Sequence, residues 1–231
     1  MTHPIVSVIL AVKNGERYLE EAIKSVLAQT YKSHEIIVVD DNSSDNTGSI
    51  INSYSQLRHI VNNGKGIADA RNTGIDAANG EYIAFQSHDD IWTNDKLSTQ
   101  VDYMLDHPEI EYVIARVKFF LDEGHSSPYG FREELFSGDH VGMIPETLLV
   151  RKSLYGKIGK FNPDYDVAED VDWFARAIDS NVPMAIIQKV LVYKRVHSAN
   201  SSSDVAKNNQ NFLKLLRRSI ERKRKQNQDK E

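Results

Sequence analysis

A polar cluster follows an apolar run in the sequence EYIAFQSHDDIW, which covers residues 81–92. The run has the composition of a buried strand, and it ends in Ser87, His88, Asp89 and Asp90. Carboxylates are preferred ligands of hard divalent cations, and such a cation is needed where a phosphate-bearing ligand meets acidic residues. Asp and Ser are also common in turns that bind nothing. The cluster therefore indicates a metal and phosphate site, an incomplete version of one, or a turn.

Two acidic pairs stand at other positions where chemistry could occur. Asp40 and Asp41 follow a second apolar run, and Glu169 and Asp170 begin a segment with the pattern of a helix. A carboxylate can act as a general base towards a hydroxyl or accept hydrogen bonds from a ligand. The first pair could instead serve a turn, and the second could stabilise a helix N-terminus by about 0.3–1 kcal/mol. Residue types alone leave both explanations open.

Alternating strand and helix patterns predict how these residues are positioned. The runs at 6–12, 35–40 and 81–85 are short and apolar without clean alternation, which is typical of strands buried on both faces. This order, with helices between the strands, predicts a doubly wound α/β fold with a mostly parallel sheet. Its ligand end is expected at the carboxyl ends of the strands. The helices are predicted within 15–30, after 42–47 and within 66–79.

The second half of the chain has a more mixed pattern. No internal repeat and no long linker interrupts the chain up to residue 204, so residues 1–204 are predicted to form one domain. The elements expected there are a helix within 94–108, a strand at 111–120, a polar loop over 122–141, a helix beginning near Glu169 and a strand at 184–196.

Composition limits the class of protein. The chain has 231 residues, of which 40% are hydrophobic, and this suits one domain of generous size. It has no cysteine, which excludes disulfide frameworks and cysteine zinc sites and favours a reducing compartment. No apolar stretch approaches about 18 residues and no signal sequence is recognisable, so the protein is expected to be soluble and cytoplasmic.

The charge is divided unevenly along the chain. The formal net charge is −5, but residues 205–231 hold nine Lys or Arg against three acids, so residues 1–204 carry −11. An acidic body argues against binding nucleic acid through its main surface. Three roles stay open for the basic tail, which are peripheral contact with an anionic membrane, self-association, and a solvated helix. The tail is predicted to be helical, with an apolar stripe formed by Phe212, Leu213, Leu215, Leu216 and Ile220.

Five segments in a fixed order resemble glycosyltransferases of family 2. They are VSVILAVKNGERYLEEAIKSVLAQTY, EIIVVDDNSSDNT, GIADARNTGIDAANGEYIAF, DDIW and AEDVDWFAR, and the resemblance spans about residues 5–200. It implies the GT-A fold, a Rossmann-like three-layer α/β/α fold with a central, mostly parallel sheet. It also implies inverting transfer of a sugar from a nucleoside diphosphate donor, usually a uridine one, with Mn2+ or Mg2+ on the diphosphate.

The resemblance also divides the chain by function. Residues 1–92 are expected to bind the nucleotide sugar, residues 93–204 the carbohydrate or lipid-linked acceptor, and residues 205–231 form the tail. Bacterial relatives commonly work at the inner face of the cell membrane, in the synthesis of cell-surface polysaccharides. A cytoplasmic protein with peripheral membrane contact is therefore expected.

The resemblance assigns the nucleotide to the ends of the first two strands. Asp40 and Asp41 are expected to bind base and ribose, since a carboxylate can accept the imide proton of uracil. Arg71 matches an arginine near the base and diphosphate, and the alternative is an arginine on a helix surface. Lys13 stands where many relatives carry tyrosine, a departure that affects the aromatic support of the base. The other expected donor contacts are Ala11, Val12 and Asn14.

The resemblance assigns a metal ion to the polar cluster at residues 87–90. Relatives carry Asp, any residue, Asp, Asp there, and Ser87 stands at the first of these positions. Asp89 is expected to bind the ion, Ser87 to hydrogen bond a ribose or sugar hydroxyl, and His88 to contact ribose or phosphate. His197, in LVYKRVHSANSS, is expected as a second ligand, and imidazole suits Mn2+ better than Mg2+. Asp90 is expected to cap the helix that follows.

Catalysis is expected to depend on the second acidic pair. Asp170 matches the base that takes the proton of the acceptor hydroxyl, with Glu169 beside it in the substrate site. Trp173 is expected to stack on an apolar face of a sugar. Lys194 or Arg195 could offset charge on the leaving diphosphate, and only one of them can face it if the strand alternates.

Two other functions are compatible with the sequence. A nucleotidyltransferase shares a nucleotide-binding α/β half, but it usually has a Gly-rich loop with Arg and Lys, which AVKNGERYL does not supply. The other is a nucleotide-sugar-binding protein without catalysis, because Ser87 removes one carboxylate from the metal motif. Turnover with Mn2+ distinguishes this binding protein from an active transferase.

Overall fold

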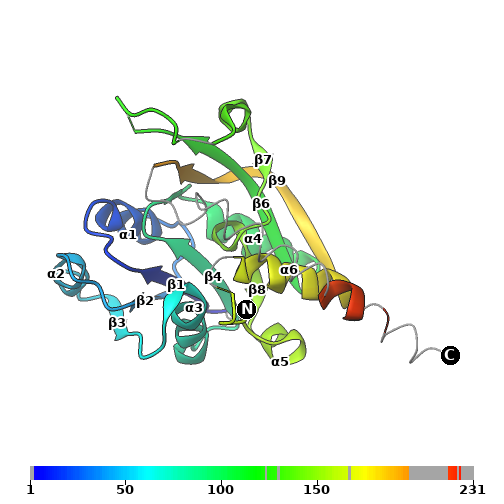
Figure 1. Cartoon of the computed structure of the whole chain (residues 1–231). Coiled ribbons are helices and arrows are strands. Elements are labelled where there is room, and N and C mark those ends of the chain that lie inside the picture. The colour runs from blue at the N-terminus through cyan, green and yellow to red at the C-terminus, as the bar shows by residue number, and fades with distance from the viewer. Residues whose placement is uncertain are drawn as a thin grey trace.

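The fold is a curved mixed sheet with helices on both faces (Figure 1). The computed structural model describes residues 3–122, 124–128, 131–165, 168–197, 218–222 and 224. Within these ranges nine strands form one sheet in the order β3-β2-β1-β4-β8-β6-β9-β5, with β7 paired to β6. The α/β class that the sequence predicts is confirmed.

Four parallel strands make up the N-terminal part of the sheet. All seven residues of β1 are buried, which explains why its sequence is apolar throughout. Parallel pairing places Val12 opposite Asp40 and Ala11 opposite Ser87, so the carboxyl ends of three strands meet at one edge. The strands are β1 (Val6–Val12), β2 (His34–Asp40), β3 (Leu57–Val61) and β4 (Tyr82–Ser87).

Helices cover both faces of this sheet. Alternate residues of β1 point into two cores, with Leu10 in the core under α1, α2 and α4 and Ile9 in the core under α3, α5 and α6. Gly74 lies so close to Ile9 that a Cβ there would meet the Ile9 side chain at 2.4 Å. The helices are α1 (Leu19–Leu27), α2 (Thr47–Asn52), α3 (Gly66–Ala77), α4 (Lys96–Asp106), α5 (Leu154–Ile158) and α6 (Glu169–Asp179).

The second half extends the same sheet. β8 (Leu149–Arg151) pairs antiparallel with β4 and with β6 (Tyr112–Phe120), and β9 (Met184–Arg195) lies parallel to β6. β5 (Ile91–Trp92) pairs antiparallel with β9. One sheet therefore runs through both of the halves that the sequence suggests, although residues 198–204 lie outside the described part of the chain.

Several elements differ from the sequence prediction. The sequence does not predict β3, because this edge strand is only partly buried and includes Arg58 and His59. The predicted loop at 122–141 contains a 3-10 helix, η1 (Glu133–Phe136), and β7 (His140–Val141). A second 3-10 helix, η2 (Pro145–Thr147), leads into β8.

The described part of the tail contacts the region of α6. Arg222 donates to Asp179 at 3.0 Å, and Arg218 donates to the Tyr165 hydroxyl at 3.2 Å. Two arginines of the basic tail therefore contact the body of the protein. Ile220 is exposed, and the other four stripe residues, Phe212, Leu213, Leu215 and Leu216, lie outside the described residues.

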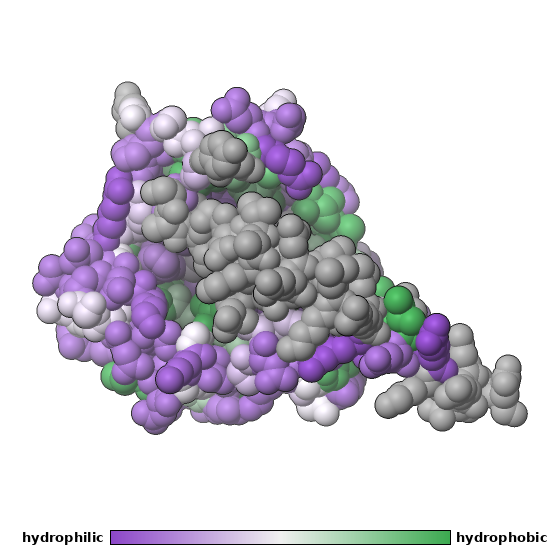
Figure 2. Space-filling view, viewed as in Figure 1, coloured by the Kyte–Doolittle hydropathy of each residue, from purple (hydrophilic) through white to green (hydrophobic). Residues whose placement is uncertain are grey.

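The described surface in Figure 2 is mainly hydrophilic, and its hydrophobic residues form small, separate patches. Scattered apolar residues of this kind are normal on protein surfaces. Among the described residues, no helix has the length and hydrophobicity needed to cross a bilayer.

Candidate active site

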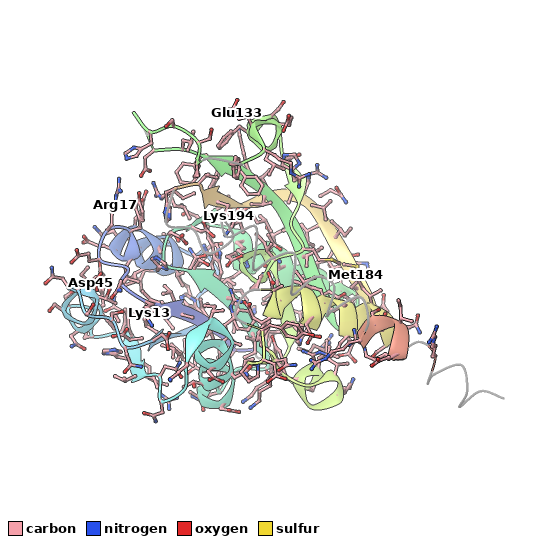
Figure 3. The ribbon with its side chains drawn as sticks, viewed as in Figure 1. Lys13, Arg17, Asp45, Glu133, Met184 and Lys194 are labelled. Atoms are coloured by element: carbon pink, nitrogen blue, oxygen red, sulfur yellow. The ribbon has the colours of Figure 1, made fainter. Side chains whose placement is uncertain are left out.

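The ends of β1, β4 and β9 and the start of α6 form the candidate site. Lys194, near the end of β9, lies towards the centre of the molecule, and Lys13 follows directly after β1 (Figure 3). The end of β9 reaches the segment after β4 because the short strand β5 pairs with β9. Residues from distant parts of the sequence are therefore brought to one edge of the sheet.

The acid pair after β2 is held by the protein itself. Asp41 accepts a hydrogen bond from Asn62 Nδ2 at 2.7 Å and one from the backbone at the start of α3 at 3.2 Å, and Lys13 Nζ lies 3.5 Å away. Asp40 Oδ1 accepts a hydrogen bond from Ser43 N at 2.9 Å. The turn chemistry is thus present at Asp40. Contacts of either carboxylate with a base or ribose stay a prediction.

The expected donor contacts at the end of β1 differ in what they can offer. The side chains of Ala11 and Val12 are buried, so only their backbone can face a nucleotide. Asn14 has a φ of 51°, a conformation that asparagine adopts more readily than most residues. Its Oδ1 accepts a hydrogen bond from Ser44 N at 2.8 Å, and its N–H donates to Ser43 Oγ at 2.8 Å. Asn14 therefore shapes the loop after β1, and its contact with a base stays a prediction.

A buried charge cluster connects the strand ends to α6. Glu146, on η2, accepts a hydrogen bond from Ser87 Oγ at 2.5 Å. Its carboxylate lies 3.6 Å from Arg71 Nη2 and 3.8 Å from Lys194 Nζ, and Arg71 also forms a close ion pair with Glu169. We call these five residues the Glu146 cluster. The sequence reasoning missed Glu146, whose only signal is a lone acid in the apolar segment MIPETLL.

The two expected metal ligands lie side by side. Asp89 Oδ2 and His197 Nε2 are 3.0 Å apart. Burial alone would raise the pKa of Asp89, but the hydrogen bond with His197 and the charges of His88 and Lys194 lower it to about 2. Within the described ranges, no group of three or more His, Asp or Glu side chains is placed to hold a metal ion. Two protein ligands would leave most positions around a divalent ion to substrate oxygens and water, and the binding of an ion by this pair stays a prediction.

Asp90 does not cap the following helix, so this expectation is wrong. Because β5 pairs with β9, the turn directs Asp90 inward, and its side chain is fully buried. Its Oδ1 accepts a hydrogen bond from Arg195 N at 2.9 Å and its Oδ2 one from Lys194 Nζ at 2.8 Å. Burial raises the pKa of Asp90 to about 7, against the opposing charge of Lys194. The helix α4 begins later, at Lys96.

Lys194 and Arg195 have different partners, as alternation along β9 requires. Burial would lower the pKa of Lys194, but the carboxylates of Asp90 and Glu146 raise it. Arg195 Nε donates to the backbone carbonyl of Asp89 at 3.0 Å. Lys194 is thus the candidate for offsetting charge on a leaving group, and Arg195 supports the backbone of Asp89, an expected metal ligand.

Asp170 occupies a position that suits a general base. It is half-buried in the first turn of α6, and its Oδ1 accepts a hydrogen bond from Val171 N at 2.7 Å. Burial raises its pKa, the charge of Arg71 lowers it and the charge of Glu146 raises it, with a net increase. Burial also raises the pKa of the neighbouring Glu169, which is paired with Arg71. A raised pKa makes a carboxylate a better proton acceptor.

Trp173 does not face a sugar site, so this expectation is wrong. Its exposed fraction is 0%, and α6 packs it into the core on the sheet. The indole lies among Tyr112, Tyr155, Phe161 and Phe174, with ring centroids at 5.7, 5.6, 6.2 and 5.3 Å. Trp173 therefore stabilises the position of α6 and cannot stack on a ligand.

Trp173→Ala is expected to destabilise the whole fold. The cavity left by a buried tryptophan costs about 3–5 kcal/mol of unfolding free energy. Urea unfolding should show a lower midpoint with an unchanged slope, and Trp173→Phe should lose less. A Trp173→Ala variant that unfolds like the parent protein but binds sugar ligands more weakly would contradict the core assignment.

A cavity opens beside the pair formed by Asp89 and His197. It has a volume of ≈ 660 Å³ and is lined by the loop after β1, by His88 and His197, and by residues 124–128. Burial lowers the pKa of His88, although the charge of Asp89 acts in the opposite direction. Gly15 lies so close that a Cβ there would be 3.0 Å from the His88 ring. A cavity of this size can hold part of a small ligand next to Asp89 and His197.

Comparison with protein families decides the classification. Residues 7–168 match the family model Glycosyl transferase family 2. The chain belongs to this family. This glycosyltransferase is similar to the Escherichia coli protein named UDP-Glc:alpha-D-GlcNAc-diphosphoundecaprenol beta-1,3-glucosyltransferase WfaP. The two are 43% identical over 103 residues, and the aligned region is 43% of this chain and 41% of WfaP. The chain spans only 37% and 66% of the length of two rickettsial relatives described as uncharacterized glycosyltransferases.

Solved structures confirm the GT-A fold of this glycosyltransferase. S. aureus TarS (residues 1–349), in complex with UDP-GlcNAc, matches with a TM-score of 0.74 over 94% of this chain and 66% of that one, at 22% identity. The mannosyltransferase PcManGT from Pyrobaculum calidifontis, in complex with GDP-Man and Mn2+, matches with a TM-score of 0.73 over 95% and 65%, at 18% identity. At these identities the likeness shows the fold alone.

Proposed function

We propose that this glycosyltransferase domain transfers a sugar, with inversion, from a nucleoside diphosphate donor to an acceptor hydroxyl. One observation carries the proposal. The Glu146 cluster lies between two parts of the site. On one side are Asp89 and His197, which the cluster reaches because Lys194 pairs with Asp90, the residue after Asp89. On the other side is Asp170, at the start of the helix whose Glu169 pairs with Arg71. A cation-binding end and a proton-accepting end joined in one site are what inverting sugar transfer requires.

Asp170 is the proposed base of the reaction. The acceptor oxygen attacks the anomeric carbon while the bond from that carbon to the diphosphate oxygen breaks, and the nucleoside diphosphate leaves with the bonding electrons. Asp170 accepts the proton of the attacking hydroxyl. Its raised pKa and its place at the partly exposed start of α6 support this role.

Asp89 and His197 are the residues that would hold a divalent ion, Mn2+ or Mg2+. When bound, such an ion supplies positive charge to the diphosphate oxygens of the donor. The low pKa of Asp89 supports this role, because the carboxylate is ionised over the whole neutral range. Lys194 lies close enough to add a fixed positive charge to the same end of the site.

The nucleotide would lie at the ends of β1 and β2 and near Arg71 of α3. Asp40, Asp41 and Arg71 are all largely buried at this edge and have partners that orient them. The complexes of TarS with UDP-GlcNAc and of PcManGT with GDP-Man support a nucleotide-sugar donor. The name of WfaP supports UDP as the nucleotide.

The proposed context is the synthesis of a cell-surface polysaccharide. WfaP is named for an acceptor carried on diphosphoundecaprenol, which supports a carbohydrate or lipid-linked acceptor. Residues 1–92 would bind the donor and residues 93–204 the acceptor. A cytoplasmic protein that contacts the inner face of the membrane through residues 205–231 would meet such an acceptor.

A second candidate is a nucleotide-sugar-binding protein without turnover. Ser87 favours it, because the strand-end motif contains one carboxylate fewer than the resemblance implies. Membership of the family sets the nucleotidyltransferase aside. Turnover of a bound donor distinguishes the two remaining candidates.

A thermal shift screen with uridine, guanosine and thymidine diphosphate sugars is expected to identify the donor. A ligand at 100 times its Kd stabilises the folded state by about 2.7 kcal/mol. The preferred donor should therefore raise the Tm in the presence of Mn2+, and the rise in Tm should be smaller with EDTA. Release of the nucleoside diphosphate should then be measured with the best donor. Stabilisation without release would support the binding protein, and no stabilisation by any donor would contradict the proposed function.

A further inference from the structure

Glu146 is a buried carboxylate where three distant elements meet. Its exposed fraction is 4%, although Glu is rarely buried without a partner. It contacts the Ser87 hydroxyl at the end of β4, the Arg71 guanidinium on α3 and the Lys194 ammonium on β9. The helix η2 that carries it packs on β4, β6 and β9. Each of these three contacts is therefore with a residue of the candidate donor site.

The contacts keep Glu146 ionised. Burial alone would raise its pKa, but the charges of Lys194 and Arg71 and the hydrogen bond from Ser87 lower it. A buried ion pair seldom stabilises a fold more than well-packed apolar residues would. The charge of Glu146 therefore has a better explanation in the site than in the stability of the core.

The hydrogen bond to Glu146 changes what Ser87 offers a ligand. Ser87 is neutral, and its hydroxyl proton points to Glu146 Oε1 at 2.5 Å. The lone pairs of its oxygen are then available to accept a hydrogen bond from a sugar or ribose hydroxyl. The two residues together present a polarised oxygen backed by a full negative charge.

We propose that Glu146 is a positioning residue for sugar transfer, which supplies the negative charge that Ser87 lacks and holds Arg71 and Lys194 between the donor and Asp170. The inference rests on the proposed function, because it names how the same site is organised. Glu146 acts through Ser87, Arg71 and Lys194 and does not itself touch the substrate. The negative charge can therefore be moved from position 146 to position 87.

Relocating the charge tests the proposal. Glu146→Gln keeps the shape but loses the charge, and kcat is expected to fall about tenfold or more because Arg71 and Lys194 are no longer held. Ser87→Asp places a second carboxylate against Glu146, and this repulsion should lower both Tm and kcat. In the double variant Ser87→Asp/Glu146→Gln one charge is again present. Its Tm should recover above that of Ser87→Asp, and its kcat should exceed that of either single variant.

The pH profile separates the effect of charge from that of packing. Burial raises the pKa of Asp170. Among the charged groups that face it, Arg71 of α3 and Lys194 of β9 lower this pKa and Glu146 of η2 raises it, and Glu169 lies beside it on α6. Since the base must be deprotonated, the rate falls below its pKa. Loss of the Glu146 charge should therefore move the acid limb of kcat to lower pH. Glu146→Asp keeps the charge and should leave the limb where it is in the parent protein.

Three readouts decide the outcome, namely kcat, Tm, and the affinity for UDP with and without Mn2+. Glu111→Gln is the matched control, because Glu111 pairs with Lys157 away from the cluster, and it should leave kcat unchanged. Two results with an active parent protein would overturn the inference. In the first, Glu146→Gln leaves both kcat and the acid limb of its pH profile unchanged. In the second, the fold-changes in kcat of the two single variants simply multiply in the double variant. A parent protein that neither binds nor turns over any donor would instead overturn the proposed function.

Discussion

Asp170→Asn is expected to slow sugar transfer by about 10²–10⁴-fold, the usual contribution of a general base. The amide cannot accept the acceptor proton, but its oxygen can keep the hydrogen bond from Val171 N. Donor affinity should therefore change little, and the loss should appear in kcat. Steady-state kinetics together with calorimetric titration of the donor measure the two effects separately.

The exposed Asp102 on α4 provides a matched control for this prediction. Asp102→Asn makes the same chemical change away from the site and should leave kcat unchanged. Because burial raises the pKa of Asp170, the acid limb of the parent profile should lie above the ordinary aspartate value of 3.8. Unchanged turnover in Asp170→Asn would show that another group accepts the proton.

Asp89→Asn is expected to abolish metal-dependent donor binding. The substitution removes the ionised carboxylate that lies 3.0 Å from His197. Of the two expected protein ligands, a divalent ion would then keep only the His197 imidazole. Changes around metal ligands cost about 10–100-fold in affinity, and loss of a ligand itself should cost at least as much. Titration of UDP with and without Mn2+ should show an advantage of the ion in the parent protein and none in Asp89→Asn.

Two comparisons make the Asp89 result specific. The weak metal-free binding of UDP should be the same in the parent and in Asp89→Asn, because the nucleotide end of the site is unaltered. His197→Ala should weaken the metal-dependent part of binding as well. If Asp89→Asn bound Mn2+ and donor as tightly as the parent protein, the ion would have to be held by other residues.

Much of the fold could be predicted from local patterns. β1, β2 and β4 are recognisable because strands buried on both faces need apolar side chains at every position. β3 is not recognisable, since an edge strand keeps polar residues such as Arg58. The capping role expected for Asp90 fails because the pairing of β5 with β9, a long-range contact, turns that side chain inward.

The candidate site shows the same division between local and long-range information. Motif order placed Asp89 and His197 in one site, and the fold brings these residues, 108 positions apart, to 3.0 Å. Trp173 has the right residue type for sugar stacking, but its burial depends on how α6 packs on the sheet. Residue type and order therefore predict a candidate role, whereas the packing of the helix decides whether the side chain can reach a ligand.

From the sequence alone came the α/β class and the prediction of a site at the strand ends, with Asp89, Asp170 and His197 as candidates through the family resemblance. Only the tertiary structure revealed Glu146, which lies 59 positions from Ser87 and accepts a hydrogen bond from its hydroxyl. The physical reason is that hydrophobic periodicity is local, whereas the charge balance of a buried site depends on side chains from several elements. A lone glutamate in an apolar segment becomes meaningful only when its partners on α3, β4 and β9 are known.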